Sequence, residues 1–430
     1  MSLPLLFAAV LILLSTKSSH GFVSPKRTVV FSLPRSYPRS SLLWGEVPLQ
    51  NKVNGDTTHS DFIDTANGDV GGSSFISPLN GGDNGASSSI LLEQSEQQAQ
   101  SANENPPSFP VVLWRFTRPH TLIGSAIAIP SIFLLASPTY ASFFTKKSMA
   151  ALAFAAFPSL LMNLYITGLN QITDVEIDKI NKPELPIAKG DLKKSTATVV
   201  VLTALAISLV MSFVHPVYST SGLQVALWGS FILGTLYSLP PFRMKRHPLL
   251  AAFCIVAVRG TIINAGFYSH ALTAAFGAAK EVASNMAGTG VLQCLLHDWK
   301  CSFSSLFFGI FGIVIALMKD VPDATGDRIF NIRSFTVRVG QKRVFRTMKN
   351  LLTLLFGTVG VALVQRAVVA TSVGVAIRRG LVGLGCLVAG WSTKWEAREV
   401  DAEDSAEVYN YYMHLWKLFY LSYLALPFVK

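Results

Sequence analysis

Two groups of polar residues carry the spacing of a metal–phosphate site. The groups are Asn170, Asp174 and Asp178, and Asp320, Asp323 and Asp327. Steps of three or four residues bring side chains to one face of a helix. A few hard oxygen ligands that leave room for substrate phosphates are typical of Mg²⁺ rather than of a transition metal. The two groups therefore predict carboxylates that hold Mg²⁺, which in turn holds a diphosphate.

Both groups stand at the ends of apolar segments. A carboxylate at bilayer depth costs about 2.5–3.5 kcal/mol even on insertion scales, and two acidic groups that face one cavity also repel each other. Bound cations remove both costs. One such group would be explained by solvated acids at an exposed helix end. Two groups on the same predicted side of a membrane favour a metal site instead.

The apolar segments that position these acids run from residue 120 to the C-terminus. Half of the 430 residues are hydrophobic, 14% are charged, and the mean hydropathy is +0.42. Soluble domains carry about 25% charged residues, so this composition excludes an ordinary cytosolic enzyme, and its apolar content excludes a disordered scaffold. Nine segments are near the length, about 20 residues, that crosses a bilayer as a helix. They are 120–140, 148–170, 195–214, 220–239, 249–270, 302–318, 348–365, 372–391 and 409–428. The sequence predicts an all-α, polytopic membrane protein with about nine transmembrane helices.

Charge along the chain gives the predicted helices an orientation. The loops after the second, fourth, sixth and eighth segments carry most of the lysines and arginines, and both acidic groups lie among them. Such a bias orients membrane helices. The net charge of +11 is thus concentrated at helix ends, which argues against binding of nucleic acid. The four cysteines lack paired spacing and predict no disulfide framework.

The first 108 residues are predicted to lie outside the membrane domain. Residues 1–45 begin with a short apolar stretch and continue with a basic, serine-rich stretch without acids. This order resembles the two-part leader of plastid proteins in algae with secondary plastids; a plain secretory signal is the alternative. Residues 46–108 are rich in Asn, Gly, Ser, Asp and Gln, which predicts a disordered linker. The expected product is a multi-pass protein of the plastid (chloroplast) membrane, spanning 109–430, with its leader removed and its basic side toward the stroma.

From residue 112 to residue 430 the chain resembles the UbiA-type membrane prenyltransferases. Besides the two acidic motifs, the resemblance rests on FTRPHTLIGS (116–125), YSLPPFRMKRHP (237–248), VRGTIINAGFYSH (258–270) and YMHLWKLFYLSYLALPF (412–428). It implies nine helices around a central cavity, with the acidic motifs near the mouth. Within the family, residues 168–183 and 319–345 are most similar to plastid members that prenylate homogentisate.

The resemblance also implies roles for individual residues. By motif position both groups would bind Mg²⁺ and diphosphate, with Asp174, Asp178, Asp323 and Asp327 as the catalytic carboxylates. The implied substrate contacts are Asn170, Arg118, Lys182, Arg243, Lys245 and Tyr237. The aromatic candidates for stabilising an allylic cation are Tyr237, Phe267, Tyr268, Tyr411 and Tyr412.

The implied activity is Mg²⁺-dependent transfer of a prenyl group, with phytyl expected, from its diphosphate to homogentisate with decarboxylation, as in tocopherol biosynthesis. Within the family the alternatives are a solanesyl donor, as in plastoquinone biosynthesis, a geranylgeranyl donor, or another aromatic acceptor. Outside the family the alternative is an ion-coupled membrane transporter. Transporters place their acids in mid-span at matching helix breaks, whereas here the acids stand at span ends beside lysine and arginine.

Overall fold

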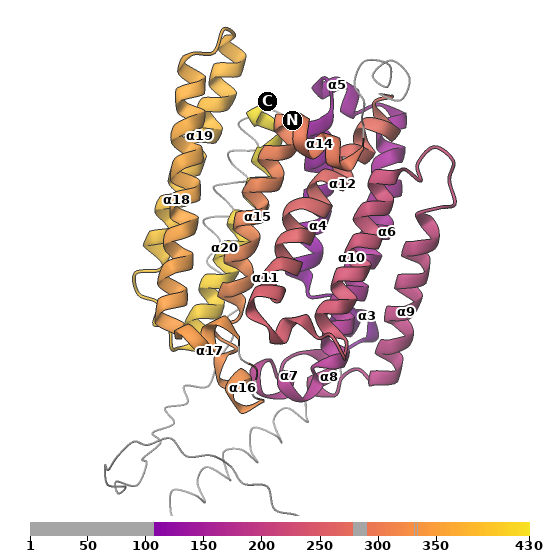
Figure 1. Ribbon diagram of the computed structural model, residues 1–430, viewed down its shortest axis with the longest axis vertical. Helices are drawn as coiled ribbons and strands as arrows, with labels where there is room; N and C mark the ends of the chain where they lie inside the picture. The colour runs from indigo at the N-terminus through magenta and orange to yellow at the C-terminus, as the bar shows by residue number, and fades with distance from the viewer. Residues whose placement is uncertain (1–106, 278–289, 331, 333) are drawn as a thin grey trace, which may run out of the picture. The chain divides into compact units, whose positions relative to one another are not determined.

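The computed structural model describes residues 107–277, 290–330, 332 and 334–430, and every regular element in this part of the chain is a helix (Figure 1). The predicted leader, and the predicted linker up to residue 106, lie outside the described residues. The membrane domain predicted from residue 109 onward coincides with the first described helix, α3 (Phe109–Phe116).

All nine apolar segments are helical. They form α4 (Pro119–Ala136), α6 (Lys146–Thr173), α9 (Lys194–Met211), α10 (Ser221–Ser238), the run Pro248–Ala275, α15 (Trp299–Lys319), α18 (Gln341–Val368), α19 (Val373–Glu396) and α20 (Ser405–Ala425). In the described residues seven of these are long and apolar enough to cross a membrane, whereas α10 and α20 are less apolar. The predicted all-α membrane fold is confirmed, and the predicted count of nine is approximate.

The run Pro248–Ala275 changes its helix type along its length. It consists of α11 (Pro248–Val256), the π-helical η2 (Ala257–Ile262), α12 (Ile263–His270) and the π-helical η3 (Ala271–Ala275). Short π-helical turns inside α-helices are rare and often stand at functional sites. The predicted membrane helix over 249–270 is therefore confirmed as helical, with two π-helical turns that its sequence did not indicate.

Shorter helices gather at the ends of the long ones. They are α5 (Tyr140–Phe143), α7 (Val175–Asn181), α8 (Pro186–Lys189), η1 (Met244–Arg246), α14 (Val291–His297), α16 (Ala324–Ile329), α17 (Phe335–Val339) and η4 (Leu426–Val429). Figure 1 shows α7, α8, α16 and α17 at the same, lower end of the long helices. We call this the basic end, because it holds the lysine- and arginine-rich loops that follow α6 and α15.

Local capping fixes where several long helices begin. The side-chain oxygen of Thr145 accepts from the backbone of Ser148 at the start of α6, and Asp298 and Asp404 cap α15 and α20 in the same way. An N-cap oxygen satisfies one of the backbone N–H groups that a helix start leaves unpaired, typically for about 1 kcal/mol. These caps are particularly useful where a helix end meets the edge of a bilayer.

Aromatic packing joins α15, α18 and α20. The ring of Phe308 stacks on Tyr423 with 3.5 Å between centroids, and Phe311 meets Phe356 and Phe419 edge-on at 5.7 and 5.3 Å. Edge-on and stacked pairs contribute about 0.5–1.5 kcal/mol each beyond the burial of their area. This cluster holds α20, one of the two less apolar long helices, against α15.

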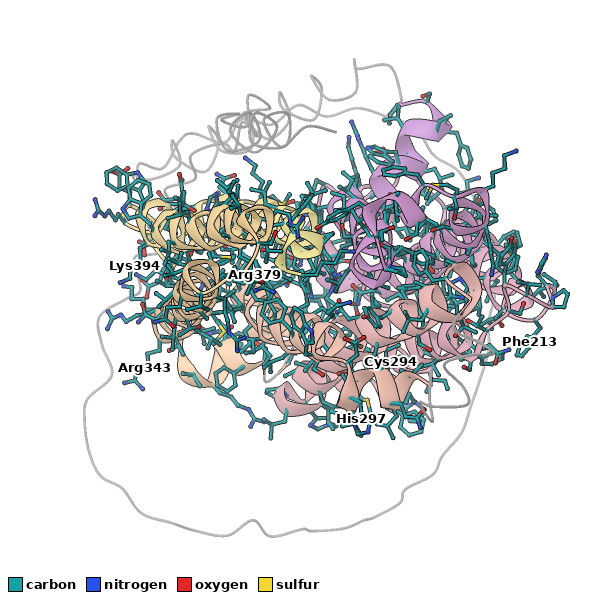
Figure 2. The ribbon with its side chains drawn as sticks, turned by 90° about the horizontal axis from the view of Figure 1, so that it is seen from above. Phe213, Cys294, His297, Arg343, Arg379 and Lys394 are labelled. Atoms are coloured by element: carbon teal, nitrogen blue, oxygen red, sulfur yellow. The ribbon has the colours of Figure 1, made fainter. Side chains whose placement is uncertain are left out.

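The outermost helices present apolar faces. Seen from above, α18 and α19, near Arg343 and Lys394, lie at the opposite edge from Phe213, which follows α9 (Figure 2). Val199 of α9, Leu354 of α18 and Leu384 of α19 are each more than half exposed. Contiguous apolar surface of this kind is unstable in water. Lipid is the solvent that these faces fit.

Candidate active site

A cavity of about 230 Å³ lies among the helices. Residues of α4, α6, α10, the run Pro248–Ala275, α15 and α20 line it, most of them apolar. In the described part of the chain α9, α18 and α19 contribute no lining residue, so six long helices rather than nine surround the cavity. The polar lining includes Arg118, Asn170, Tyr237, Arg259 and Lys319.

The chain breaks its helices at the acidic motifs. Asp174 ends α6 and precedes α7, with φ −113° and ψ 14°, and Asp320 ends α15 while Asp323 precedes α16. The prediction that each group lies on one face of a continuous helix is therefore wrong. The physical reason is that Asp174 and Asp323, at the helix breaks, are held by cations from other parts of the chain.

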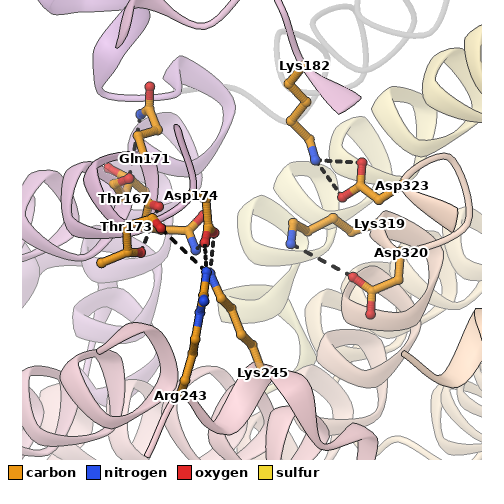
Figure 3. A network of polar contacts seen from close by, with 11 residues as sticks. Thr167, Gln171, Thr173, Asp174, Lys182, Arg243, Lys245, Lys319, Asp320 and Asp323 are labelled. Atoms are coloured by element: carbon orange, nitrogen blue, oxygen red, sulfur yellow. Dashed lines mark hydrogen bonds and ion pairs between the residues drawn. The ribbon is translucent and has the colours of Figure 1, made fainter. Parts of the chain in front are cut away.

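The first acidic group is centred on Asp174. Its Oδ1 accepts from Arg243 at 2.9 Å, and its Oδ2 accepts from Lys245 and, at 2.9 Å, from the amide of Asn170 (Figure 3). Although burial opposes ionisation of Asp174, the charges and hydrogen bonds of Lys245 and Arg243 hold the pKa of this carboxyl below its usual value. Burial lowers the pKa of Lys245 to about 8, against the opposing effect of Asp174. Asp174 is thus an ionised carboxylate that neutralises two basic side chains.

The second acidic group pairs with lysines. The ammonium of Lys182 donates to both carboxylate oxygens of Asp323, at 2.6 and 2.5 Å, and Lys319 lies 3.8 Å from Asp320 (Figure 3). Burial raises the pKa of Asp320, and Lys319 opposes that rise. The predicted diphosphate contacts Lys182, Arg243 and Lys245 are therefore occupied by the acids themselves in this structure. Lys319 was missing from the predicted set, although its position directly before Asp320 was a signal for it.

Two buried carboxylates lack a comparable cation. Asp178 and Asp327 are 6% and 8% exposed, and neither forms an ion pair within the described residues. Burial raises the pKa of each to about 6; Asp174 and Asp323 add to the rise at Asp178, and Asp320 and Asp323 add to it at Asp327. The helices that carry Asp178 and Asp327, α7 and α16, contact each other, so the two acidic groups, far apart in sequence, come together at the basic end.

These acids fit a cation that is shared with a substrate. The Oδ2 atom of Asp178 is buried without a hydrogen-bond partner. Among the described residues no three His, Cys, Asp or Glu side chains form a complete metal cage. Mg²⁺ seldom needs one, because it usually takes one or two carboxylates and fills its remaining positions with phosphate oxygens and water. The donor set therefore fits Mg²⁺ together with a diphosphate, and does not fit a self-contained structural metal.

A contact between α7 and α16 holds the two motifs together. The backbone N–H of Gly326 donates to Oδ1 of Asn181 at 3.0 Å. A Cβ on Gly326 would lie 2.1 Å from that oxygen, so no side chain fits at this position without moving Asn181. The glycine is thus required for the close approach of the two acidic segments.

Gly326→Ala is expected to lower activity about 100-fold, because a displacement of about 1 Å between catalytic groups has an effect of that size. It should also lower the free energy of unfolding by about 1–3 kcal/mol through overpacking and loss of the hydrogen bond. The measurements are turnover in membranes and the melting temperature. Gly385→Ala in α19 is the matched control, since nothing lies within 4 Å of a Cβ there. Equal behaviour of the two variants would contradict the role of the contact.

Arg118 lies next to these groups. It precedes α4 in a left-handed conformation with φ 51°, lines the cavity and favours the charged form of Asp178. Its Nε is buried without a hydrogen-bond partner. An arginine that is not bonded to the acids is available to a bound anion.

The predicted aromatic residues divide into two sets. Tyr237, Phe267 and Tyr412 line the cavity. The prediction is wrong for Tyr268, whose hydroxyl donates to Asp298 at 2.6 Å, and for Tyr411, whose hydroxyl donates to the carbonyl of Thr393 at 3.0 Å; neither lines the cavity. Sequence spacing does not separate the two sets, because neighbouring residues such as Phe267 and Tyr268 point in different directions from the same helix.

Known proteins are similar in sequence to this chain over most of its length. The model of the UbiA prenyltransferase family matches residues 107–418. Homogentisate phytyltransferase 1, chloroplastic, from Arabidopsis thaliana is 37% identical over 78% of this chain and 80% of its own length. A homogentisate geranylgeranyltransferase from Triticum aestivum is 36% identical over 74% and 72%. The chloroplastic homogentisate solanesyltransferase of Arabidopsis thaliana is 33% identical over 74% and 76%.

Proposed function

Because the chain belongs to the UbiA prenyltransferase family and is a prenyltransferase, we propose that it transfers a phytyl group from phytyl diphosphate to homogentisate, with loss of carbon dioxide. The observation that carries the proposal is the meeting of two acidic motifs and their basic partners beside an apolar cavity between membrane helices. The similarity to homogentisate phytyltransferase over most of both chains supports the acceptor and the donor.

The carboxylates of both groups are proposed to hold Mg²⁺, with Asp178 and Asp327 as the ones that lack a cation, and with Asn170, Asp174, Asp320 and Asp323 beside them. When bound, Mg²⁺ neutralises charge on the diphosphate oxygens. With a diphosphate bound, the cationic partners of Asp174 and Asp323 would turn from these carboxylates to the phosphate. Lys182, Arg243 and Lys245 thereby exchange a carboxylate for a diphosphate without leaving the site.

The basic residues stabilise the leaving group. As the bond between the prenyl carbon and the diphosphate oxygen breaks, its electron pair goes to the oxygen, and negative charge builds up at the basic end. Arg118 and Lys319 line the cavity there and add to the three exchanged cations. Hydrogen bonds from charged donors that are already in place are worth more in such a water-poor site than in solution.

The cavity protects the allylic cation left behind. Its walls are mostly apolar and exclude water, which would otherwise quench the cation. Tyr237, Phe267 and Tyr412 present rings to the same space, and an aromatic face attracts a cation. The electron-rich ring of the acceptor attacks through a carbon beside a hydroxyl group and then loses its proton. The methylene group left by carbon dioxide gains a proton and becomes a methyl group.

We place the protein in the plastid (chloroplast) membrane with its basic end toward the stroma. The phytyltransferase and solanesyltransferase relatives are chloroplastic by name, and the order of charges in residues 1–45 is that of a targeting leader. This orientation places the lysine- and arginine-rich loops on the stromal side, as the charge bias of membrane proteins predicts.

A donor competition tests the proposal. Purified protein in lipid nanodiscs receives Mg²⁺, homogentisate and equal amounts of phytyl, geranylgeranyl and solanesyl diphosphates, and mass spectrometry identifies the product. The phytyl product is expected to exceed the solanesyl product at least about tenfold, because a longer chain must bury more methylene groups in the same cavity and a well-packed wall resists extra volume. A dominant solanesyl product would reassign the donor. Absence of any prenyl product, together with Mg²⁺-independent ion uptake when the same protein is reconstituted in sealed liposomes, would favour the transporter.

A further inference from the structure

Two arginines in the described lining of the cavity form no ion pair: Arg118, which lies beside Asp178 at the mouth, and Arg259. Arg259 lines the cavity from η2, in the middle of the membrane-spanning run Pro248–Ala275. No carboxylate in the described ranges lies within 4 Å of its guanidinium. Lys182, Arg243 and Lys245 each have such a partner. Arg259 is therefore a cation inside a membrane helix that the acidic motifs do not explain.

Two aromatic rings hold this guanidinium. Its central carbon lies 5.0 Å from the ring centre of Trp416 and 5.8 Å from that of Phe419, both in α20. Rings in this position attract the cation but leave its N–H donors unpaired. A planar guanidinium that lies on rings is well suited to bind a carboxylate through two parallel hydrogen bonds.

The backbone around Arg259 is shaped for close packing. The next residue, Gly260, faces Gly309 of α15, and a Cβ on Gly260 would lie 2.6 Å from the Cα of Gly309. The amide of Asn264 donates to the carbonyl oxygens of Arg259 and Gly260 at 2.6 and 3.0 Å. The π-helical turn and these contacts fix where the arginine side chain leaves the helix.

Arg259 lies deeper than the acidic motifs. A Cβ added to Gly312 of α15 would lie 3.6 Å from the Cβ of Arg259, which is its nearest neighbour. Arg259 therefore lies at the level of Gly312. Gly312 precedes Lys319, at the basic end of the same helix, by about two turns, which corresponds to roughly 10 Å. The backbone of Arg259 thus lies about two helical turns farther along the cavity than Lys319 at the basic end. This difference in depth is the reason to expect that Arg259 serves another anion than the cations at the mouth.

We propose that Arg259 binds the carboxylate of the aromatic acceptor. The inference rests on the proposed function, which supplies a small acceptor with a carboxylate on one side of an aromatic ring. With the carboxylate on Arg259, the ring extends from there toward the allylic carbon at the mouth. Binding also cancels a positive charge that would oppose formation of a cation in the same cavity. An ionisable residue within the membrane normally marks such a functional contact.

Arg259→Gln tests the proposal, with Arg259→Lys as the conservative variant. In Arg259→Gln the KM for homogentisate should rise about 10- to 100-fold, as expected for a lost hydrogen bond to a charged group, while the KM for phytyl diphosphate changes less than about threefold. Arg259→Lys should recover part of the loss, because it restores the charge without the planar fork. The affinity of Arg259→Gln for homogentisate, measured by calorimetric titration, should fall by the same factor.

The matched control is Arg378→Gln in α19. Arg378 also lies over a ring, that of Tyr140 at 5.4 Å, but it does not line the cavity. The KM values of Arg378→Gln for homogentisate and for phytyl diphosphate should therefore stay at the wild-type level. An unchanged KM and calorimetric affinity in Arg259→Gln would overturn the proposal, as would equal increases in both KM values.

A second measurement compares two ligands, and its outcome for the wild-type protein does not depend on a variant folding. The neutral amide of homogentisate should bind about 10- to 100-fold more weakly than homogentisate, and Arg259→Gln should remove this preference. Equal binding of acid and amide by the wild type would overturn the role of Arg259. Failure of the proposed function gives a different pattern: homogentisate binds with the Arg259-dependent preference, but no prenylated product forms.

Discussion

Asp174→Asn and Asp323→Asn are each expected to reduce prenyl transfer about 10²- to 10⁴-fold. Asp174 neutralises Arg243 and Lys245, and Asp323 neutralises Lys182. Loss of one fixed electrostatic contact in an active site typically lowers turnover about 10²- to 10³-fold. The basic groups left buried and unpaired are expected to disturb the site further. Each variant also lacks a carboxylate that is proposed to hold Mg²⁺.

The assay is product formation in membranes with saturating homogentisate and phytyl diphosphate over a series of Mg²⁺ concentrations. Glu403→Gln is the matched control, because Glu403 pairs with Lys342 on an exposed surface, 3.1 Å away, where ion pairs contribute little. It should retain activity within about twofold of the wild type. Near-normal turnover in either asparagine variant would rule out the metal–diphosphate assignment.

A double variant separates the ion pair from the metal. If Lys182 and Asp323 act as one unit, the loss in Lys182→Met/Asp323→Asn should be smaller than the product of the two single losses, as is usual for groups in contact. If Asp323 acts only through a metal, the two losses should multiply. The comparison thus measures how much of the activity lost in Asp323→Asn is due to the broken ion pair with Lys182.

The nine helices were predictable because a bilayer imposes both length and composition on the segments that cross it. Helices satisfy their backbone groups internally, so apolar segments such as 348–365 indicated α18 without any knowledge of its neighbours. The membrane also explains why the acids stood out. In a soluble protein the spacing of Asp174 and Asp178 would be an ordinary solvated helix face, whereas beside an apolar segment it requires a cation.

The helix breaks at the acids were not predictable, because they depend on contacts with distant parts of the chain. The sequence between Asn170 and Asp178 contains no glycine or proline, and the break at Asp174 is held by Arg243 and Lys245 from beyond α10. Similarly, a regular helix gives no reason for Arg259 to face the cavity. The π-helical turn and the rings of α20 determine its direction, and both belong to the packed structure.

Mg²⁺ binding is expected to weaken roughly 100-fold between pH 7 and pH 5. The pKa values of Asp178 and Asp327 are raised to about 6, so each carboxyl is mostly ionised at pH 7 and mostly protonated at pH 5. A metal ligand must lose its proton before it binds, which gives about a factor of ten for each carboxylate over this range. In the absence of Mg²⁺, folding stability changes with pH in the opposite direction: it falls as the pH rises. Because these pKa values lie above those of the unfolded chain, the two groups add stability that is fully present below about pH 4 and is lost as the pH rises through 6.

The melting temperature of the purified protein, measured with and without Mg²⁺ from pH 5 to pH 8, separates the two effects. The shift caused by Mg²⁺ should grow with pH, since a ligand that binds only the folded state stabilises it according to its affinity. Asp178→Asn and Asp327→Asn should each remove about half of the pH dependence, on a logarithmic scale of affinity. Asp401→Asn, a change of an exposed carboxylate in the loop before α20, should leave it unchanged. A Mg²⁺-dependent shift of constant size from pH 5 to pH 8 would mean that the metal does not displace protons from these two carboxylates, and the ion would then have to be held by the already ionised Asp174.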